Sequence, residues 1–223
     1  MKGFAFDLEG TCVDVEVLHF TAYERALAEF DVTMSAEEVA SIPGAIGGGN
    51  LFIFSFLRTT FPSLTESALY ERKKYHFNVL FNEAVLNPRE GLTDYLDYLR
   101  SIGAPVSIGS TTRREFGREI LKRSGLDMYF DFKSCVFRED VTSLKPSPEV
   151  YVRTATSMQI EPTEQIVFED SIVGITAGMA AGSVVVAIPG QFGLNPRRMS
   201  ELNSSGAQSL YTTWRSVPHS IGA

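Results

Sequence analysis

Four short apolar runs constrain the fold more than any other feature of the sequence. Each has the length of a strand and is rich in β-branched or aromatic residues; the runs cover residues 3–6, 104–108, 165–168 and 183–188. The first three are followed within two residues by a polar residue. Such runs are typical of strands buried on both faces of a parallel sheet. Segments with helical spacing alternate with them from about residue 90 onward, which predicts right-handed βαβ crossovers and a doubly wound, mainly parallel α/β sheet.

Residues 16–85 break this alternation. They contain aromatic residues at helical spacing, a glycine-rich stretch from Gly44 to Gly49 and a further helical segment that extends to about Phe81. In an open α/β sheet the ligand crevice lies at the carboxyl ends of the strands, so a helical insert that leaves there would cover it. We therefore predict a Rossmann-like core domain of residues 1–15 and 86–223, with a small helical cap domain at residues 16–85.

Composition narrows the classes of partner. Charged residues make up 21% of the 223 residues and the net charge is -7, which argues against nucleic acid or an anionic membrane as the main partner. No apolar stretch reaches the roughly 18 residues of a membrane span, and we expect no signal peptide. Cys12 and Cys135 lack the spacing of a metal site, and we expect buried free thiols. These features favour a cytoplasmic protein, monomeric or homodimeric.

Two carboxylates follow the first apolar run. Asp7 and Glu9 are two residues apart, so in an extended chain both side chains point to the same side. Gly10 allows the backbone to turn sharply beside a ligand. One carboxylate could attack or hold a metal while the other moves protons. Taken alone, such a pair is more often a solvated loop feature, so the interpretation depends on the other strand ends.

The runs at 104–108 and 165–168, and the loop between them, also lead to residues suited to phosphate chemistry. Ser110 and Thr111 follow the second run, where a hydroxyl and backbone N–H groups at a helix start can bind phosphate or simply cap the helix. Lys145 lies in a proline-braced loop, and its ammonium could neutralise an incoming phosphate. Glu169 and Asp170 follow the run at 165–168, and such hard oxygen ligands suit Mg²⁺. Four such features in this order predict a phosphate-transferring site.

In these motifs the sequence resembles the haloacid dehalogenase superfamily, in particular the branch with a helical cap after the first strand. That branch includes β-phosphoglucomutase and many small phosphatases. The resemblance covers nearly the whole chain and rests on Asp7-Leu8-Glu9-Gly10-Thr11, Ser110, Lys145 and Glu169-Asp170.

The resemblance implies a metal site and a covalent step. Asp7 would be the nucleophile that forms an aspartyl-phosphate, and also a ligand of Mg²⁺. Asp170 would be the second carboxylate on the metal, and Glu169 would ligate or brace it. The backbone carbonyl of Glu9 would complete the protein ligands.

The resemblance also assigns the remaining catalytic roles. Ser110 and Lys145 would bind the transferring phosphoryl group, which is mainly electrostatic work. Glu9 stands where the family has a second aspartate, the general acid/base. Glutamate is one methylene longer, but enolase-phosphatases of the same superfamily share Asp-x-Glu-Gly-Thr, so it is compatible with phosphatase chemistry.

We predict a Mg²⁺-dependent phosphatase that hydrolyses a small phosphorylated metabolite. Substrate contacts are expected from Thr111, Arg113, His19 and Gly47, with the surface from Gly47 to Arg58 setting the fit. The nearby aromatic residues are expected in the core of the cap; these are Phe52, Phe54 and Phe56.

Three alternatives stay open. A β-phosphoglucomutase-like mutase is favoured by His19 and Arg113 but opposed by Glu9 and by the lack of an arginine near Gly47. A phosphonate hydrolase would need a cap lysine, and residues 39–57 contain none. A catalytically silent binding protein on the same scaffold is opposed by the retention of all four motifs.

Overall fold

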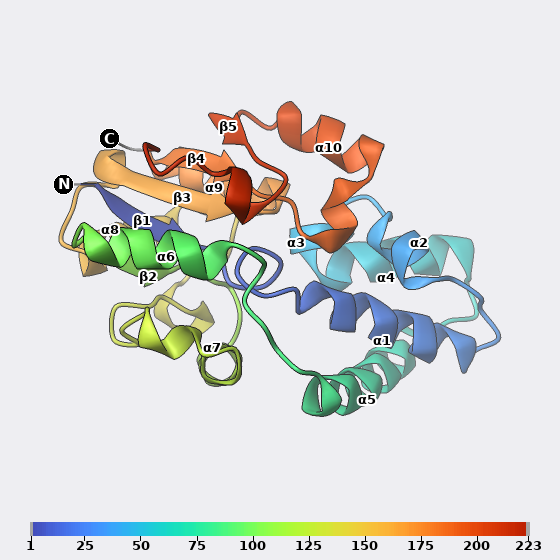
Figure 1. Cartoon of the computed structure of the whole chain (residues 1–223). Coiled ribbons are helices and arrows are strands. Elements are labelled where there is room, and N and C mark those ends of the chain that lie inside the picture. Colours follow the sequence, from blue (N-terminus) through green and yellow to red (C-terminus); the bar gives the residue numbers. More distant parts are fainter. Residues whose placement is uncertain (1, 222–223) are drawn as a thin grey trace. The chain divides into compact units, whose positions relative to one another are not determined.

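The structure is a computed structural model that describes residues 2–221, and it divides into two compact units (Figure 1). The first, the core unit, comprises Met1–Asp14 and Leu86–Ala223. The second, the inserted unit, comprises Val15–Val85. The chain therefore leaves the core unit shortly after its first strand and returns to it before the others.

The core unit is built on a five-stranded parallel sheet in the order β2-β1-β3-β4-β5. Its strands are β1 (Gly3–Phe6), β2 (Val106–Ile108), β3 (Gln165–Glu169), β4 (Val184–Ala187) and β5 (Ser209–Leu210). The predicted parallel α/β sheet is thus confirmed. The two residues of β5 were not predicted, because a strand so short has no recognisable pattern.

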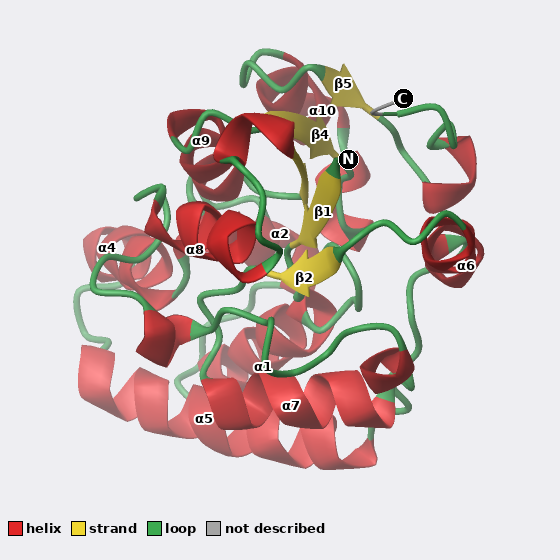
Figure 2. Ribbon diagram, turned by 90° about the vertical axis from the view of Figure 1, so that its left-hand side faces the viewer, coloured by secondary structure: helices red, strands yellow, loops and turns green. Residues whose placement is uncertain are grey.

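Helices cover both faces of this sheet (Figure 2). In that view α8 and α9 lie on the left of the strands and α6 lies on the right. The helices are α6 (Leu92–Ser101), α7 (Arg114–Arg123), α8 (Glu149–Ser157), α9 (Ile172–Ala180) and α10 (Pro196–Asn203). Because both faces are covered, the central strands are buried throughout, as their continuous apolar runs require.

An aromatic cluster fills the core on the α6 side. Phe6 stacks on Phe168 with ring centroids 5.0 Å apart, and Trp214 lies 4.9 Å from Phe168. Tyr95 of α6 packs edge-on against Phe168 at 5.5 Å. Smaller residues such as Ala5 point to the opposite face, where α8 and α9 pack close to the sheet. The strand β1, which leads into Asp7 and Glu9, is therefore firmly packed between two layers of side chains.

The inserted unit is helical. Its elements are α1 (Glu16–Ala28), α2 (Ala36–Ala40), α3 (Ala45–Gly48), α4 (Asn50–Thr60) and α5 (Glu66–Glu83). Three phenylalanines of α4 were expected in the core of the inserted unit. Phe54 is buried there, but the expectation is wrong for Phe52 and Phe56, which are exposed. Alternate residues of a helix cannot share one face, because the helical repeat is 3.6 residues.

The glycine-rich stretch makes room for an aromatic ring. A methyl group on Gly44 would stand 2.6 Å from the ring of Phe52, and one on Gly48 would also stand 2.6 Å from it. Gly44 and Gly47 also have left-handed backbone angles, with φ of 79° and 76°. The glycines therefore have a structural explanation within the inserted unit.

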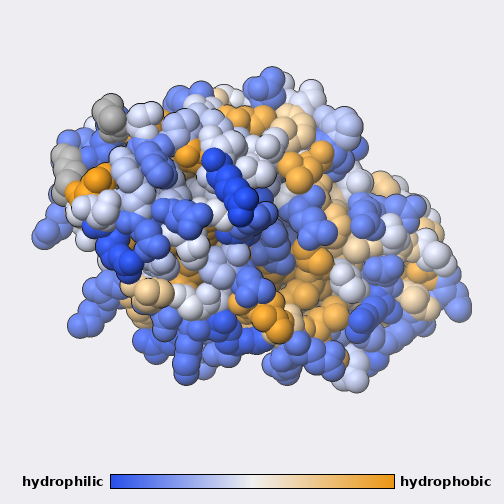
Figure 3. Space-filling view, viewed as in Figure 1, coloured by the Kyte–Doolittle hydropathy of each residue, from blue (hydrophilic) through white to orange (hydrophobic). Residues whose placement is uncertain are grey.

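The surface is mixed. The face in Figure 3 is mainly hydrophilic, with apolar side chains interspersed. Within residues 2–221 no helix is long and apolar enough to cross a membrane. Cys12 and Cys135 are buried free thiols, as predicted.

Candidate active site

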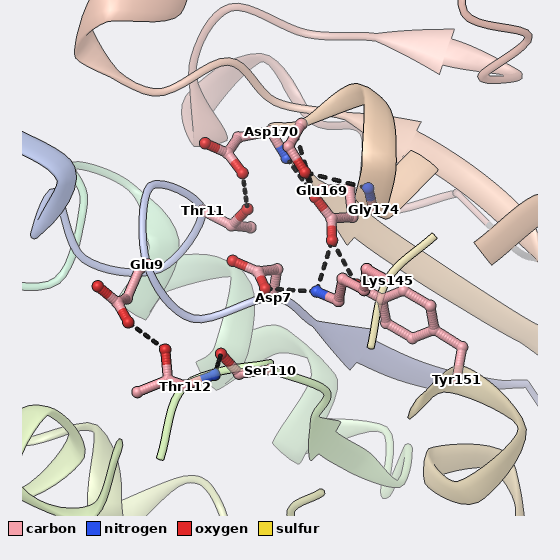
Figure 4. Close-up of polar contacts among 11 residues, drawn as sticks. Asp7, Glu9, Thr11, Ser110, Thr112, Lys145, Tyr151, Glu169, Asp170 and Gly174 are labelled. Atoms are coloured by element: carbon pink, nitrogen blue, oxygen red, sulfur yellow. Dashed lines mark hydrogen bonds and ion pairs between the residues drawn. The ribbon is translucent and has the colours of Figure 1, made fainter. Parts of the chain in front are cut away.

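Polar side chains gather at the carboxyl edge of the sheet, where three neighbouring strands end (Figure 4). They come from the loops after β1, β2 and β3, from the last residue of β3, from the segment that leads into α8 and from α8 itself. The residues involved are Asp7, Glu9, Thr11, Ser110, Thr112, Lys145, Tyr151, Glu169 and Asp170. Residues far apart in sequence thus converge as the parallel topology requires.

Lys145 joins two carboxylates from neighbouring strands. Its Nζ donates to Oδ1 of Asp7 at 2.5 Å and to Oε1 of Glu169 at 2.7 Å. The Lys145 side chain is only 5% exposed, and that of Glu169 is fully buried. Buried charges are tolerated only when they are paired and hydrogen-bonded, so Lys145 fixes the positions of both carboxylates.

Burial and pairing shift the pKa values of this cluster. Burial raises the pKa of Asp7 to about 7, opposed by the Lys145 ammonium and reinforced by Glu169. Burial alone would lower the pKa of Lys145, but Asp7 and Glu169 outweigh it and hold that pKa above its ordinary value. Burial also raises the pKa of Tyr151 well above its usual range. Lys145 therefore stays charged, and Tyr151 keeps its proton as a donor.

Glu169 is hydrogen-bonded through both of its oxygens. Oε1 accepts from the hydroxyl of Tyr151 at 2.7 Å as well as from Lys145. Oε2 accepts from the backbone N–H of Asp170 at 3.1 Å and from the N–H and hydroxyl of Ser171 at 3.2 and 3.0 Å. Glu169, expected to ligate or brace the metal, is thus directed at Lys145 and at the start of α9, where a negative charge is favoured.

Gly174 leaves room for the Glu169 carboxylate. A methyl group at this position of α9 would stand 1.8 Å from Oε1 and 2.2 Å from Oε2 of Glu169. No side chain fits at that distance. The small residue in the first turn of α9 is therefore part of the site.

The loop after β1 is held from several sides. Gly10 has a φ of 84°, which favours glycine, and its carbonyl accepts from Arg89 at 2.8 Å. Trp214 Nε1 donates to the carbonyl of Thr11 at 3.0 Å. The hydroxyl of Thr11 in turn lies 3.5 Å from Oδ1 of Asp170. Through this contact, the loop after β1 reaches the residue that follows β3.

The residues after β2 contact the second carboxylate of the first motif. The hydroxyl of Thr112 donates to Oε1 of Glu9, and the backbone N–H of Thr112 donates to Oγ of Ser110 at 3.3 Å. Ser110 is buried at the end of β2. The structure thus brings Asp7, Glu9 and Ser110 to one edge of the sheet.

The charge balance of the site suits a divalent cation. Asp7, Glu169 and Asp170 are three buried carboxyl groups and Lys145 is one buried ammonium, so the site has an excess of two negative charges when all three carboxyl groups are ionised. Uncompensated buried charge is costly, and Mg²⁺ prefers carboxylate and carbonyl oxygens.

The surrounding backbone also leaves space. A methyl group on Gly190 would lie 3.3 Å from the carbonyl oxygen of Gly10 and 3.5 Å from Oδ2 of Asp170. Across residues 2–221, however, no three His, Cys, Asp or Glu side chains form a metal-holding group. A cation here would need backbone carbonyl and water ligands beside two carboxylates.

Predicted substrate residues are spread over both units. Arg113 is exposed and directly precedes α7 in the core unit. Gly47 is exposed within α3, and His19 lies on α1, both in the inserted unit. There Nδ1 of His19 lies 2.7 Å from Nζ of Lys73, a buried lysine that the sequence analysis did not assign a role. Their contacts with substrate stay predictions, as does that of Thr111.

Glu149 is a bracing residue that the sequence analysis missed. Its carboxylate accepts from the backbone N–H groups of Thr142 and Ser143 at 2.8 and 2.9 Å, and from Arg153 at 2.8 Å. It thereby fixes the start of the loop that carries Lys145. The hydrogen bond from Ser143, followed by that from Arg153, lowers the pKa of Glu149 to about 2.

Three other contributing residues also escaped prediction. Tyr151 lies on an apolar helix face and Thr112 in the segment after a strand, and neither position carries a motif that marks its contact. Arg89 follows a proline at the return to the core unit, with no local sign of its partners. The polar hydroxyl of a tyrosine on an apolar face was the one available signal, since such hydroxyls find a partner when buried.

The chain matches a family model and is similar to proteins with assigned activities. A family model described as haloacid dehalogenase-like hydrolase matches residues 4–188. A phosphorylated carbohydrates phosphatase of Thermotoga maritima is 29% identical over 184 residues, which cover 82% of this chain and 82% of that protein. A β-phosphoglucomutase of Bacillus subtilis is 24% identical over 194 residues, which cover 84% and 83%.

The fold is also shared with a solved structure. A conserved haloacid dehalogenase-like protein of unknown function from Agrobacterium tumefaciens superposes with a TM-score of 0.87. The match covers 99% of this chain and 97% of that chain at 21% identity. Likeness at this identity shows a common fold.

Gly174→Ala should destabilise the protein. The added methyl would meet the buried Glu169 carboxylate, whose two oxygens are already fixed, so we expect the free energy of unfolding to fall by about 3 kcal/mol. Denaturant unfolding measures this, with Thr176→Ala at an exposed position of the same helix as control. Equal unfolding free energies for the two variants would contradict the placement of Glu169.

Glu149→Gln should lower the melting temperature in a pH-dependent way. The folded-state pKa of Glu149 is depressed to about 2 from 4.5, so its contribution is present above about pH 4.5 and is lost as pH falls toward 2. The difference from wild type should therefore be larger at pH 7 than at pH 3 in thermal melts. Glu119→Gln, exposed on α7, should show no such dependence. A pH-independent difference for Glu149→Gln would refute the role of its charge.

Proposed function

Because the chain belongs to the haloacid dehalogenase-like hydrolase family, we propose that it is a Mg²⁺-dependent phosphatase of small phosphorylated metabolites, with phosphorylated carbohydrates as the favoured class. The proposed reaction proceeds through an aspartyl-phosphate on Asp7. The substrate class is supported by the resemblance to a phosphorylated carbohydrates phosphatase over most of both chains.

The observation that carries the proposal is the buried salt bridge of Lys145 with Asp7 and Glu169. It holds a carboxylate at the end of a strand beside a permanent positive charge. A nucleophilic carboxylate must be fixed close to an anionic phosphate, and the ammonium offsets the repulsion between them. A merely structural ion pair would not need a further carboxylate, Asp170, buried beside it.

Asp7 would attack the phosphorus while its neighbours hold the phosphoryl oxygens. Ser110 accepts a hydrogen bond from the N–H of Thr112, which leaves its own hydroxyl proton to donate to a phosphoryl oxygen. Lys145 would donate to another. Glu9 would give a proton to the departing alcohol and then take one from the water that hydrolyses the intermediate.

Asp7, Asp170 and the backbone carbonyl of Glu9 would hold Mg²⁺. The cation would supply charge neutralisation for the phosphoryl group and for the excess negative charge of the site. Glu169 would act on Lys145 instead of on the metal, since both its oxygens are engaged within the protein. The donor set is then two carboxylates, one carbonyl and water, which is usual for Mg²⁺.

A sugar-phosphate mutase is the second candidate. It is favoured by the resemblance to a β-phosphoglucomutase over 84% of this chain. A mutase would need a bisphosphate activator and would interconvert isomers, whereas a phosphatase releases inorganic phosphate steadily. In the proposed roles, Glu9 decides between them, because it controls whether water or a second hydroxyl is activated.

Asp7→Asn should abolish turnover. Phosphate release is measured with Mg²⁺ on a panel of sugar phosphates and other small phosphate esters, and loss of the nucleophile should lower kcat by at least about 10³-fold. Removal of Mg²⁺ with EDTA should abolish activity, and added Mg²⁺ should restore it.

Asp94→Asn, exposed on α6, is the matched control and should keep wild-type activity. The proposal fails if wild type is inactive across the panel, or if Asp7→Asn turns over as fast as wild type. Isomer formation that depends on a bisphosphate, without net phosphate release, would establish the mutase instead.

A further inference from the structure

We propose that Thr112 is a positioning residue for the general acid/base, and that Thr112 and the longer Glu9 form a matched pair. The inference rests on the proposed function and names a residue that determines how Glu9 performs its part. It is carried by one contact: the Thr112 hydroxyl donates to Oε1 of Glu9, across 103 positions of sequence (Figure 4).

The hydroxyl is held by a fixed backbone. The carbonyl of Thr112 accepts from the N–H of Arg138 at 3.0 Å, and its own N–H donates to Oγ of Ser110 at 3.3 Å. Threonine is β-branched, so few side-chain rotamers are open to it. Thr112 therefore presents its hydroxyl in a defined direction at the end of β2.

The backbone next to Glu9 is also fixed by hydrogen bonding. The turn that follows it is closed by a hydrogen bond from Gly10 N to the carbonyl of Val13 at 2.8 Å. The side chain then has one more rotatable bond than an aspartate, and that bond must be ordered for proton transfer to be efficient. The Thr112 hydroxyl is a hydrogen-bond donor to the Glu9 carboxylate at the position that the extra methylene lets it reach. Both residues belong to the core unit.

The contact assigns one carboxylate oxygen of Glu9, Oε1, to the Thr112 hydroxyl. A hydroxyl can donate to a carboxylate oxygen or to the carbonyl oxygen of a protonated carboxyl, so Thr112 can keep Oε1 in both states. The exchanging proton then resides on Oε2.

This arrangement serves both halves of the reaction. As Asp7 bonds to phosphorus, the bond from phosphorus to the leaving oxygen breaks, and that oxygen takes the Oε2 proton. In the second half Oε2 takes a proton from water, the water oxygen bonds to phosphorus, and the Asp7 carboxylate is released.

Thr112→Val tests the pair, because it removes the hydroxyl and keeps the shape. The kcat and KM values are measured with Mg²⁺ for phenyl phosphate and para-nitrophenyl phosphate, which differ in leaving-group basicity but little in size. We expect kcat/KM for phenyl phosphate to fall about 10- to 100-fold, the usual effect of losing a hydrogen bond to a charged group. The better leaving group needs less acid assistance and should lose less than about 3-fold. KM should stay within about 2-fold for both, since Thr112 acts through Glu9.

Two further variants separate positioning from other roles. Thr112→Ser keeps the hydroxyl and should retain most of the activity. In a Glu9→Asp background the carboxylate is too short for the contact, so adding Thr112→Val should have little further effect. Thr156→Val, exposed on α8 with its hydroxyl bonded to its own helix, is the control.

The outcomes distinguish this inference from the proposed function. If wild type hydrolyses neither ester nor any member of the sugar-phosphate panel, the proposed function fails and this inference fails with it. If Asp7→Asn is inactive but Thr112→Val matches wild type on both esters, only the pairing is wrong. A rise in KM that persists in the Glu9→Asp background would mean that Thr112 binds substrate directly, and would also overturn it.

Discussion

The salt bridge of Lys145 with two buried carboxylates is the interaction on which the rest of the site depends. Taking a charge out of water costs several kcal/mol per ion, and this cost is offset only when every charge meets a partner. Lys145 meets Asp7, which directly follows β1, and Glu169 at the end of β3, and these two strands are hydrogen-bonded neighbours. Removal of one partner would leave a buried charge uncompensated, at a cost of about 3–5 kcal/mol. The same contact therefore holds the site together and fixes the position of Asp7, the proposed nucleophile.

Much of the surrounding sequence serves this contact. Tyr151 and the start of α9 occupy the remaining acceptor sites of Glu169, and Gly174 leaves the space in which its carboxylate lies. Glu149 fixes the loop that presents Lys145. These residues would not touch a substrate, yet each limits where the Asp7 carboxylate can be. Preorganisation of this kind is what allows electrostatic catalysis to avoid reorganisation during the reaction.

The strands and the motif residues could be predicted because their signals are local. Buried parallel strands appear as continuous apolar runs, and residues at their carboxyl ends must meet. The partners of Glu169 and Glu9 could not be predicted, since Tyr151 and Thr112 come from elements 18 and 103 positions away. The assignment of Phe52 to a helical core failed because a two-residue spacing does not follow the helical repeat.

Trapping of the phosphoenzyme is the decisive test of an aspartyl-phosphate on Asp7. Wild-type protein is mixed with Mg²⁺ and its best substrate, quenched within the first turnovers and treated with hydroxylamine, which converts an acyl phosphate to a hydroxamate. The peptide that contains Asp7 is then analysed by mass spectrometry. We expect a hydroxamate at Asp7 that is absent without substrate. Sustained phosphate release with Asp7 unmodified, or a hydroxamate on another carboxylate, would contradict it.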